Sequence, residues 1–190
     1  MRNILTSFVI AIAFAAPARA ADNYAIDPSH SVVQFSVDRF GFNKVLGQVP
    51  VIEGVVALDE KAPAKSAVNV KLDLAGLWSG DATRDEHVKG PRWFDVENFA
   101  TASFASTAVR RTGDNTAEVD GVLSLHGVDA PVTLKVTLNK RGDDPASKKE
   151  AAGFSATALL KRSDFGMTTA LGLVGDEVTI IIEALAHKTD

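Results

Sequence analysis

Apolar and polar residues alternate along most of the chain beyond residue 30. The clearest runs are residues 68–74 and 132–138, in which Val or Leu occupies every second position. A period of two places successive side chains on opposite faces of a β-strand, so each run predicts a strand with one apolar face. The same pattern, less regular, predicts six more strands and so eight in all, at residues 31–40, 45–58, 102–110, 117–126, 154–162 and 178–187.

Two segments interrupt this alternation, at residues 78–99 and 163–175. Within the first segment, Thr83 followed three residues later by Glu86 predicts a capped helical turn. Irregular segments that are held on a rigid sheet commonly carry binding groups. We therefore interpret both segments as functional loops.

Eight antiparallel strands in one small domain either stack as a sandwich or close on themselves, because open edges invite aggregation. We predict closure: an all-β, eight-stranded antiparallel barrel with two irregular loop segments and short helical turns. Small residues on the alternating faces would leave the lumen open, the alternative being that they pack against other strands or the loops. These small residues are Ala102, Ala108, Ala117, Gly121, Ala156, Ala158, Ala184 and Ala186.

Residues 1–20 have the features of a cleaved export signal. Arg2 supplies a positive charge, residues 4–16 are predominantly apolar, and Ala18 and Ala20 are small residues at a cleavage site. The alternative is a membrane anchor, but an apolar run of about 13 residues falls short of the roughly 20 that cross a bilayer. We therefore expect one domain over residues 21–190, located in the periplasm, with the extracellular medium as the alternative compartment.

Composition excludes several kinds of chemistry. The chain has no cysteine, and therefore no disulfide, no thiol nucleophile and no thiolate metal ligand. Without residues 1–20, 18 basic residues stand against 24 acidic ones, and this net charge of −6 argues against nucleic-acid binding. His30, His87, His126 and His187 are not spaced as metal ligands. We expect neither a metal nor a cofactor.

Six landmarks, in order and at matching spacing, resemble the YceI-like family over residues 24–187. They are residues 24–31 (YAIDPSHS), 84–87 (RDEH), 93–96 (WFDV), 121–128 (GVLSLHGV), 161–167 (KRSDFGM) and 174–178 (VGDEV). The resemblance implies an extended lipocalin-like barrel that binds polyisoprenoid or related long-chain lipids, usually in the periplasm and sometimes as a dimer. Two departures bear on head-group preference rather than on the fold: Asp38-Arg39 where the family often has Lys-His, and Ala100 where a proline is usual.

Aromatic side chains are the predicted walls of the lipid site. The predicted ligand-binding residues are Phe35, Phe40, Phe42, Trp78, Trp93, Phe94, Phe99, Phe104, Phe154 and Phe165, with Met167 as an adaptable filler. Arg84 and His87, in the first irregular segment, are predicted to meet a polar head group. The alternatives are ordinary core packing for each aromatic residue and, for the loop cations, solvation or an ion pair of Arg84 or Arg162 with Asp85 or Asp164.

The predicted function is that of a binding protein rather than an enzyme. It would hold a long-chain isoprenoid, such as an isoprenoid quinone, or another lipid, as a carrier or a buffer. The alternative is a hydrolase or isomerase that acts on a lipid through Arg84, Asp85 and His87. A homodimer, and a membrane protein that donates or accepts lipid, are further partners that the sequence leaves open.

A second group of residues has the composition of a catalytic triad. Asp27 and the run Ser29-His30-Ser31 are close in sequence. Neighbouring residues of a strand point to opposite faces, so we expect these side chains not to converge as a triad. We expect His30 and Asp27 instead to hold the start of the first strand by hydrogen bonds.

Overall fold

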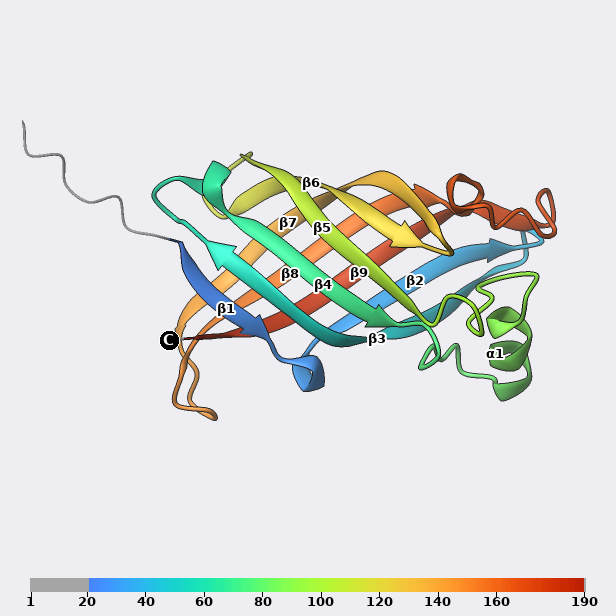
Figure 1. Ribbon diagram of the computed structural model, residues 1–190, viewed down its shortest axis with the longest axis horizontal. Coiled ribbons are helices and arrows are strands. Elements are labelled where there is room, and N and C mark those ends of the chain that lie inside the picture. The colour runs from blue at the N-terminus through green and yellow to red at the C-terminus, as the bar shows by residue number, and fades with distance from the viewer. Residues whose placement is uncertain (1–20, 190) are drawn as a thin grey trace, which may run out of the picture.

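The alternating segments form one antiparallel sheet that closes into a barrel (Figure 1). The computed structural model describes residues 21–189, so the predicted signal peptide lies outside the described residues. All eight predicted strands are present, and a ninth precedes them. The strands are β1 (Asp22–Ile26), β2 (Val32–Arg39), β3 (Asn43–Leu58), β4 (Ala67–Asp73), β5 (Thr101–Arg111), β6 (Thr116–Leu125), β7 (Val128–Asp143), β8 (Glu150–Lys161) and β9 (Val174–Lys188).

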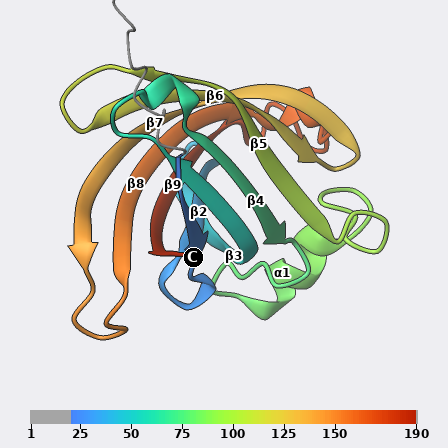
Figure 2. The same ribbon diagram turned by 60° about the vertical axis from the view of Figure 1, so that its left-hand side comes forward.

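Closure of the barrel depends on the pairing of β3 with β4. The order of the sheet is β1-β3-β2-β9-β8-β7-β6-β5-β4, and the additional β3–β4 pairing joins its two sides. Another seam joins β2 to β9, where Val33 lies opposite Ile182. Figure 2, turned toward one end of the barrel, shows the strands curving round a shared interior. The prediction of a closed eight-stranded antiparallel barrel is therefore confirmed.

The additional strand β1 continues the position of β2 in the barrel wall. Both strands lie between β3 and β9: Tyr24 is opposite Val56 and Lys188, while β2 pairs with earlier parts of the same two strands. A short 3-10 turn, η1 (Pro28–His30), separates them. Asp27 caps this turn by accepting a hydrogen bond from the Ser29 backbone N–H. The barrel therefore has eight wall positions, one of which is built from two strands.

The loops gather at two ends that differ in structure. The end that we call the α1 end carries the β2–β3 hairpin, residues 74–100 with the helix α1 (Ala82–Lys89), and the β8–β9 loop with the 3-10 turn η3 (Arg162–Phe165) (Figure 1). The opposite end, the η2 end, carries the turn η2 (Pro63–Lys65) and the short β5–β6 and β7–β8 connections. Both irregular segments predicted from sequence thus lie at the α1 end. Among residues 21–189, no helix is long and apolar enough to span a bilayer.

The helix α1 is present in the first irregular segment, but its predicted cap was wrong. Asp81, not Thr83, is the N-cap, and its carboxylate accepts a hydrogen bond from the Arg84 backbone N–H at 2.8 Å. An aspartate satisfies a free amide of the first turn as well as threonine does. The helix consequently starts at Ala82, two residues earlier than predicted, and Thr83 lies inside it.

An ion-pair cluster fastens the start of β1 to the β7–β8 hairpin. Arg141 contacts three carboxylates, those of Asp22 at 3.2 Å, Glu60 at 2.8 Å and Glu150 at 2.6 Å. The fully buried Tyr24 donates its hydroxyl to Glu150 Oε1 at 2.8 Å. The hydrogen bonds from Tyr24 and then from Arg141 lower the pKa of the Glu150 carboxyl from 4.5 to about 2.

We expect this cluster to make the barrel lose stability in acid. Because the folded pKa of Glu150 is depressed, its stabilising contribution is complete above about pH 4.5 and is lost as the pH falls toward 2. Glu150→Gln should therefore flatten the decline in melting temperature over that range, as followed by circular dichroism. Glu118→Gln, on the exposed pair with Arg110, controls for the deletion of a carboxylate. An unchanged decline in Glu150→Gln would contradict the assignment.

Candidate functional site

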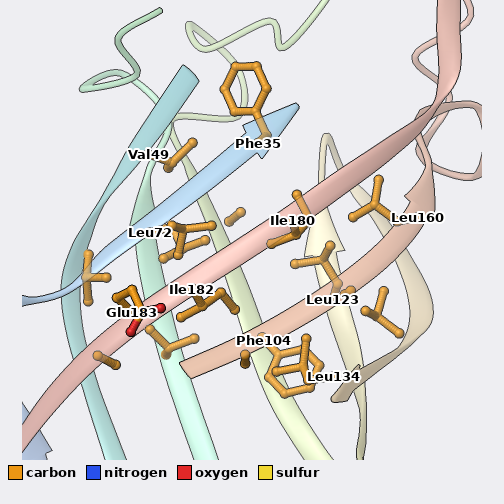
Figure 3. A pocket seen from close by; sticks show the side chains of 18 of the residues that line it. Phe35, Val49, Leu72, Phe104, Leu123, Leu134, Leu160, Ile180, Ile182 and Glu183 are labelled. Atoms are coloured by element: carbon orange, nitrogen blue, oxygen red, sulfur yellow. The ribbon is translucent and has the colours of Figure 1, made fainter. Parts of the chain in front are cut away.

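A cavity of about 1030 Å³ runs through the barrel (Figure 3). The side chains that face it from the strands are almost all apolar, because one face of each alternating strand points inward. Figure 3 shows them projecting from several strands into one space. The labelled apolar side chains are Phe35, Val49, Leu72, Phe104, Leu123, Leu134, Leu160, Ile180 and Ile182.

Small residues help to keep this interior open. Five of the predicted small residues line the cavity: Ala102, Ala117, Ala156, Ala158 and Ala184. Ala108, in contrast, is exposed on β5. An alanine leaves several carbon atoms' worth of space unfilled compared with leucine, so a wall of alternating alanine and larger residues does not plug its own centre.

Two aromatic rings lie over glycines instead of crossing the lumen. Phe35 pairs across the strands with Gly47, and a Cβ added to Gly47 would lie 2.2 Å from Cζ of the Phe35 ring. A Cβ added to Gly121 would likewise lie 2.3 Å from Cζ of Phe104. Each ring therefore occupies the space of a missing side chain on the barrel wall. The two rings therefore line the cavity without blocking it.

Polar groups meet the cavity at the α1 end. Trp93 Nε1 donates to His87 Nε2 at 3.1 Å. Since the indole N–H only donates, His87 Nε2 must accept, and in the neutral ring the proton is then on Nδ1. Arg84 donates to the Ser79 hydroxyl and to the Ser79 carbonyl, each at 2.8 Å. These contacts fix Arg84 and His87 beside the aromatic lining.

Arg162 is a buried cation of the cavity wall. It is 5% exposed, and its guanidinium donates to the carbonyls of Met167 at 2.6 Å, Gly175 at 2.9 Å and Val174 at 3.0 Å. Its Cζ also lies 5.4 Å from the centre of the Trp93 ring. Burial lowers the pKa of this guanidinium from its ordinary value. Arg162 thus fastens the β8–β9 loop and places positive charge at one end of an apolar space.

Most of the predicted ligand-binding residues line the cavity. These are Phe35, Phe40, Arg84, His87, Trp93, Phe94, Phe104, Phe154 and Met167. Sequence reasoning did not include Arg162 or the inward aliphatic residues among the site residues. The alternation along β8 could have identified them. Every second residue from 154 to 162 points to the same face of the strand, and residues 154, 156, 158, 160 and 162 all line the cavity.

Four predicted residues lie elsewhere. Phe42 is at the tip of the β2–β3 hairpin and is 88% exposed, and Trp78 lies exposed beside β3. Phe99 packs on His126, with ring centres 5.0 Å apart. Phe165 is buried in the core, and its carbonyl accepts a hydrogen bond from His126 Nδ1 at 3.0 Å. Whether the remaining residues bind a ligand stays a prediction.

The residues proposed for catalysis are engaged in structural contacts. Asp85 accepts hydrogen bonds from the backbone and hydroxyl of Ser79, whereas His87 contacts Trp93, so Asp85 and His87 have separate partners. The alternative ion pair of Arg84 with Asp85 is replaced by the contacts of both residues with Ser79.

The Asp27 group does converge, contrary to our expectation, because η1 is a 3-10 turn and not a strand. Ser29 Oγ and Asp27 Oδ2 both contact the same atom, His30 Nδ1, at 3.0 and 2.8 Å. A relay from serine through histidine to aspartate needs both ring nitrogens. The three side chains therefore fasten the turn, as the predicted hydrogen bonds between His30 and Asp27 imply.

A model of the YceI-like domain matches residues 24–186, which confirms the family resemblance. A UPF0312 protein of Pseudomonas putida is 40% identical over 159 residues, covering 83% of this chain and 82% of the relative. Protein YceI of Salmonella arizonae is 34% identical over 183 residues, or 95% of each chain.

Solved structures share the barrel. Burkholderia cenocepacia BcnA superposes with a TM-score of 0.75 at 26% identity, over 85% of this chain and 99% of BcnA. A polyisoprenoid binding domain from Saccharophagus degradans superposes with a TM-score of 0.64 at 14% identity, over 87% of this chain and 98% of that domain. At 14% identity the likeness concerns the fold alone.

Proposed function

Because the chain belongs to the YceI-like domain family, we propose that its cavity holds a long-chain apolar lipid and that the protein is a periplasmic carrier or buffer for it. The ligand class that we propose is a polyisoprenoid or an isoprenoid quinone. The S. degradans barrel is named for polyisoprenoid binding, and that name makes this class the first to test here.

The observation that carries the proposal is the size and apolar lining of the cavity. Its volume of about 1030 Å³ is at the upper limit of the roughly 300–1,000 Å³ of ordinary small-molecule pockets. A flexible chain of about 30 carbon atoms, at ~0.3 kcal/mol per atom, would gain ~9 kcal/mol. That free energy corresponds to a dissociation constant below about 1 µM without any charged contact.

Charge at the two ends favours one orientation of the lipid. At the α1 end the cavity is lined by Arg39, Arg84 and Arg162 against one carboxylate, Asp81, whereas at the η2 end it is lined by Asp59, Glu60 and Asp114 against one cation, Arg111. The α1 end therefore has two more cations than carboxylates, and the η2 end has two more carboxylates than cations. A phosphate or a carbonyl-rich head group is attracted by the guanidinium groups and repelled by the carboxylates. We therefore place the head group at the α1 end and the hydrocarbon tail along the strands.

Organic extraction of the purified protein, followed by mass spectrometry, tests this function. We expect close to one intact isoprenoid lipid per barrel, and we expect the lipid-free protein to bind an added polyprenyl phosphate or quinone with micromolar or tighter affinity. A protein that neither retains nor takes up such lipids would contradict the proposal. Turnover of offered lipid esters that disappears in His87→Ala would instead support the hydrolase.

A further inference from the structure

Exposed large apolar side chains are concentrated in the loops of one end of the barrel. Six of them lie in the β2–β3 hairpin, at Trp78 and in the β8–β9 loop, and Val128, beside the β6–β7 turn, is a seventh at that end. The six are Phe40, Phe42, Leu46, Trp78, Leu171 and Leu173. We call these six residues the apolar rim. Among the described residues, the loops of the η2 end, at 59–66, 112–115 and 144–149, carry no exposed large apolar side chain. The asymmetry therefore distinguishes the two ends.

Backbone contacts bring the apolar rim together from three parts of the chain. The Phe40 backbone N–H donates to the Leu173 carbonyl at 2.8 Å, which joins the β2–β3 hairpin to the β8–β9 loop. Trp78 forms an antiparallel bridge with Gln48, two residues from Leu46 on the same outer face of β3. Figure 1 shows the hairpin and the β8–β9 loop side by side at this end.

Five of the six residues of the apolar rim, all except Trp78, lie in two segments whose charged side chains are cations. Within residues 39–46 and 165–175, the charged side chains are Arg39 and Lys44, and no acidic residue is present. The carboxylate of Asp38, directly before the first segment, accepts a hydrogen bond from the Gly41 backbone N–H. The Arg39 guanidinium lies 4.5 Å from the centre of the Phe40 ring, and both residues also line the cavity. Exposed apolar groups flanked by cations have the composition of a surface that enters the boundary layer of an anionic bilayer.

The backbone adopts an unusual conformation at one residue of the apolar rim, Phe40, and at Ala170, which directly precedes Leu171. Phe40 has a φ of 58° and Ala170 has a φ of 55°. A left-handed backbone is unfavourable for both residue types, whereas glycine or asparagine would adopt it readily. A phenylalanine at this position lowers the stability of the folded protein, which is consistent with a function of its ring in binding rather than in folding.

We propose that the apolar rim inserts into the surface of a bilayer that contains anionic phospholipid. Insertion would set the α1 end of the cavity, with Arg39 and Phe40, directly against the lipid. Docking would allow lipid to enter and leave the cavity, and this purpose rests on the proposed function. The docking itself is inferred from the exposed side chains alone. A second copy fits less well, because a two-fold contact of this surface would bring two sets of Arg39 and Lys44 into one interface.

Vesicle flotation tests the docking. We expect wild-type protein to float with vesicles of phosphatidylcholine and phosphatidylglycerol in equal parts. A double variant that combines Phe42→Asp and Leu173→Asp should bind these vesicles at least about tenfold more weakly, because both positions lose a large apolar side chain that would be buried in the bilayer. Leu173 is 61% exposed, and neither it nor Phe42 lines the cavity. The control is Val55→Asp, at 46% exposure on the part of β3 that pairs with β1, away from the α1 end, and this variant should bind as wild type does.

A charge variant tests the preference for anionic lipid. Lys44→Gln should weaken binding about fivefold on the mixed vesicles and leave binding to phosphatidylcholine alone unchanged. Lys149→Gln, at the η2 end, should have no effect. All proteins are prepared from one exporting host and their N termini are checked by mass spectrometry, so that any contribution of residues 1–20 is common to every variant.

Two results would overturn the docking proposal: wild type that fails to bind the mixed vesicles, or equal binding by the Phe42 and Leu173 double variant. A dimer that sedimentation detects in wild type and not in the double variant, together with no vesicle binding, would assign the surface to a second copy. Lipid content, measured on the same preparations, reports on the cavity separately. Vesicle binding by a protein without extractable lipid would support docking and contradict the lipid-holding function.

Discussion

Arg162→Met is expected to lower the melting temperature by roughly 6–12 °C. The buried guanidinium is the shared donor for three carbonyls, at Met167 in the β8–β9 loop and at Val174 and Gly175 at the start of β9. Removal of hydrogen bonds to a charged group and desolvation of the acceptors left behind would cost about 3 kcal/mol, and each kcal/mol shifts the transition by about 2–4 °C in a domain of this size. Thermal unfolding followed by circular dichroism measures the change.

The matched control is Arg110→Met. Arg110 pairs with Glu118 and Asp120 on the exposed face of β5, where its side chain is 51% exposed, and exposed ion pairs contribute about 0–1 kcal/mol. Arg162→Lys should rescue little, because an ammonium cannot reproduce the planar set of guanidinium donors. Equal melting temperatures for the Arg162 and Arg110 variants would show that the loop does not depend on the buried cation.

Gly47→Leu is expected to weaken lipid binding about tenfold while the barrel stays folded. The added side chain would take the space that the Phe35 ring now occupies and would turn that ring into the lumen. The lost volume is on the order of one five-carbon isoprene unit, or roughly 1.5 kcal/mol at ~0.3 kcal/mol per atom. Titration of the lipid-free protein with a polyprenyl phosphate, and lipid content after purification, measure the effect.

Gly153→Leu provides the control for this substitution. A Cβ added to Gly153 meets no atom within 4 Å, so the new side chain should not disturb the wall. Phe154 lines the cavity and Gly153 does not, and neighbouring strand residues point to opposite faces, so the side chain should not enter the cavity either. Its affinity for lipid should match that of wild type. Equal affinities of the Gly47 and Gly153 variants would mean that the lipid does not use the part of the lumen beside Phe35.

The sequence predicted the barrel well because a period of two is a direct consequence of strand geometry. Strand β1 escaped detection because its five residues, DNYAI, are too few to show a period. The position of Tyr24, fully buried against the Arg141 cluster, depends on pairing with residues at the far end of the chain. Local pattern contains no information on such pairing.

The site residues on strands were predicted better than those in loops, because the alternation of side chains along a strand shows which residues face inward. Phe35, Phe104 and Phe154 lie on strands, where alternation with neighbouring Val and Ala already indicates the inward face. Loop residues have no such alternation. The sequence therefore predicted both Trp78 and Trp93 as ligand-binding residues, although Trp93 lines the cavity and Trp78 is exposed outside it. Residue type alone does not distinguish a wall from a rim.

The seam between β2 and β9 also constrains how the molecule acquires its shape. Val33, near the start of the described chain, lies opposite Ile182, near its finish. Contacts between such distant residues form slowly, because a long loop must close before they can be made. The apolar inner face of the sheet stays exposed to water until β9 pairs with β2, and a chain in which this pairing has not formed would be prone to self-association. The pairing of β9 with β2 is thus the event that commits the polypeptide to its native state.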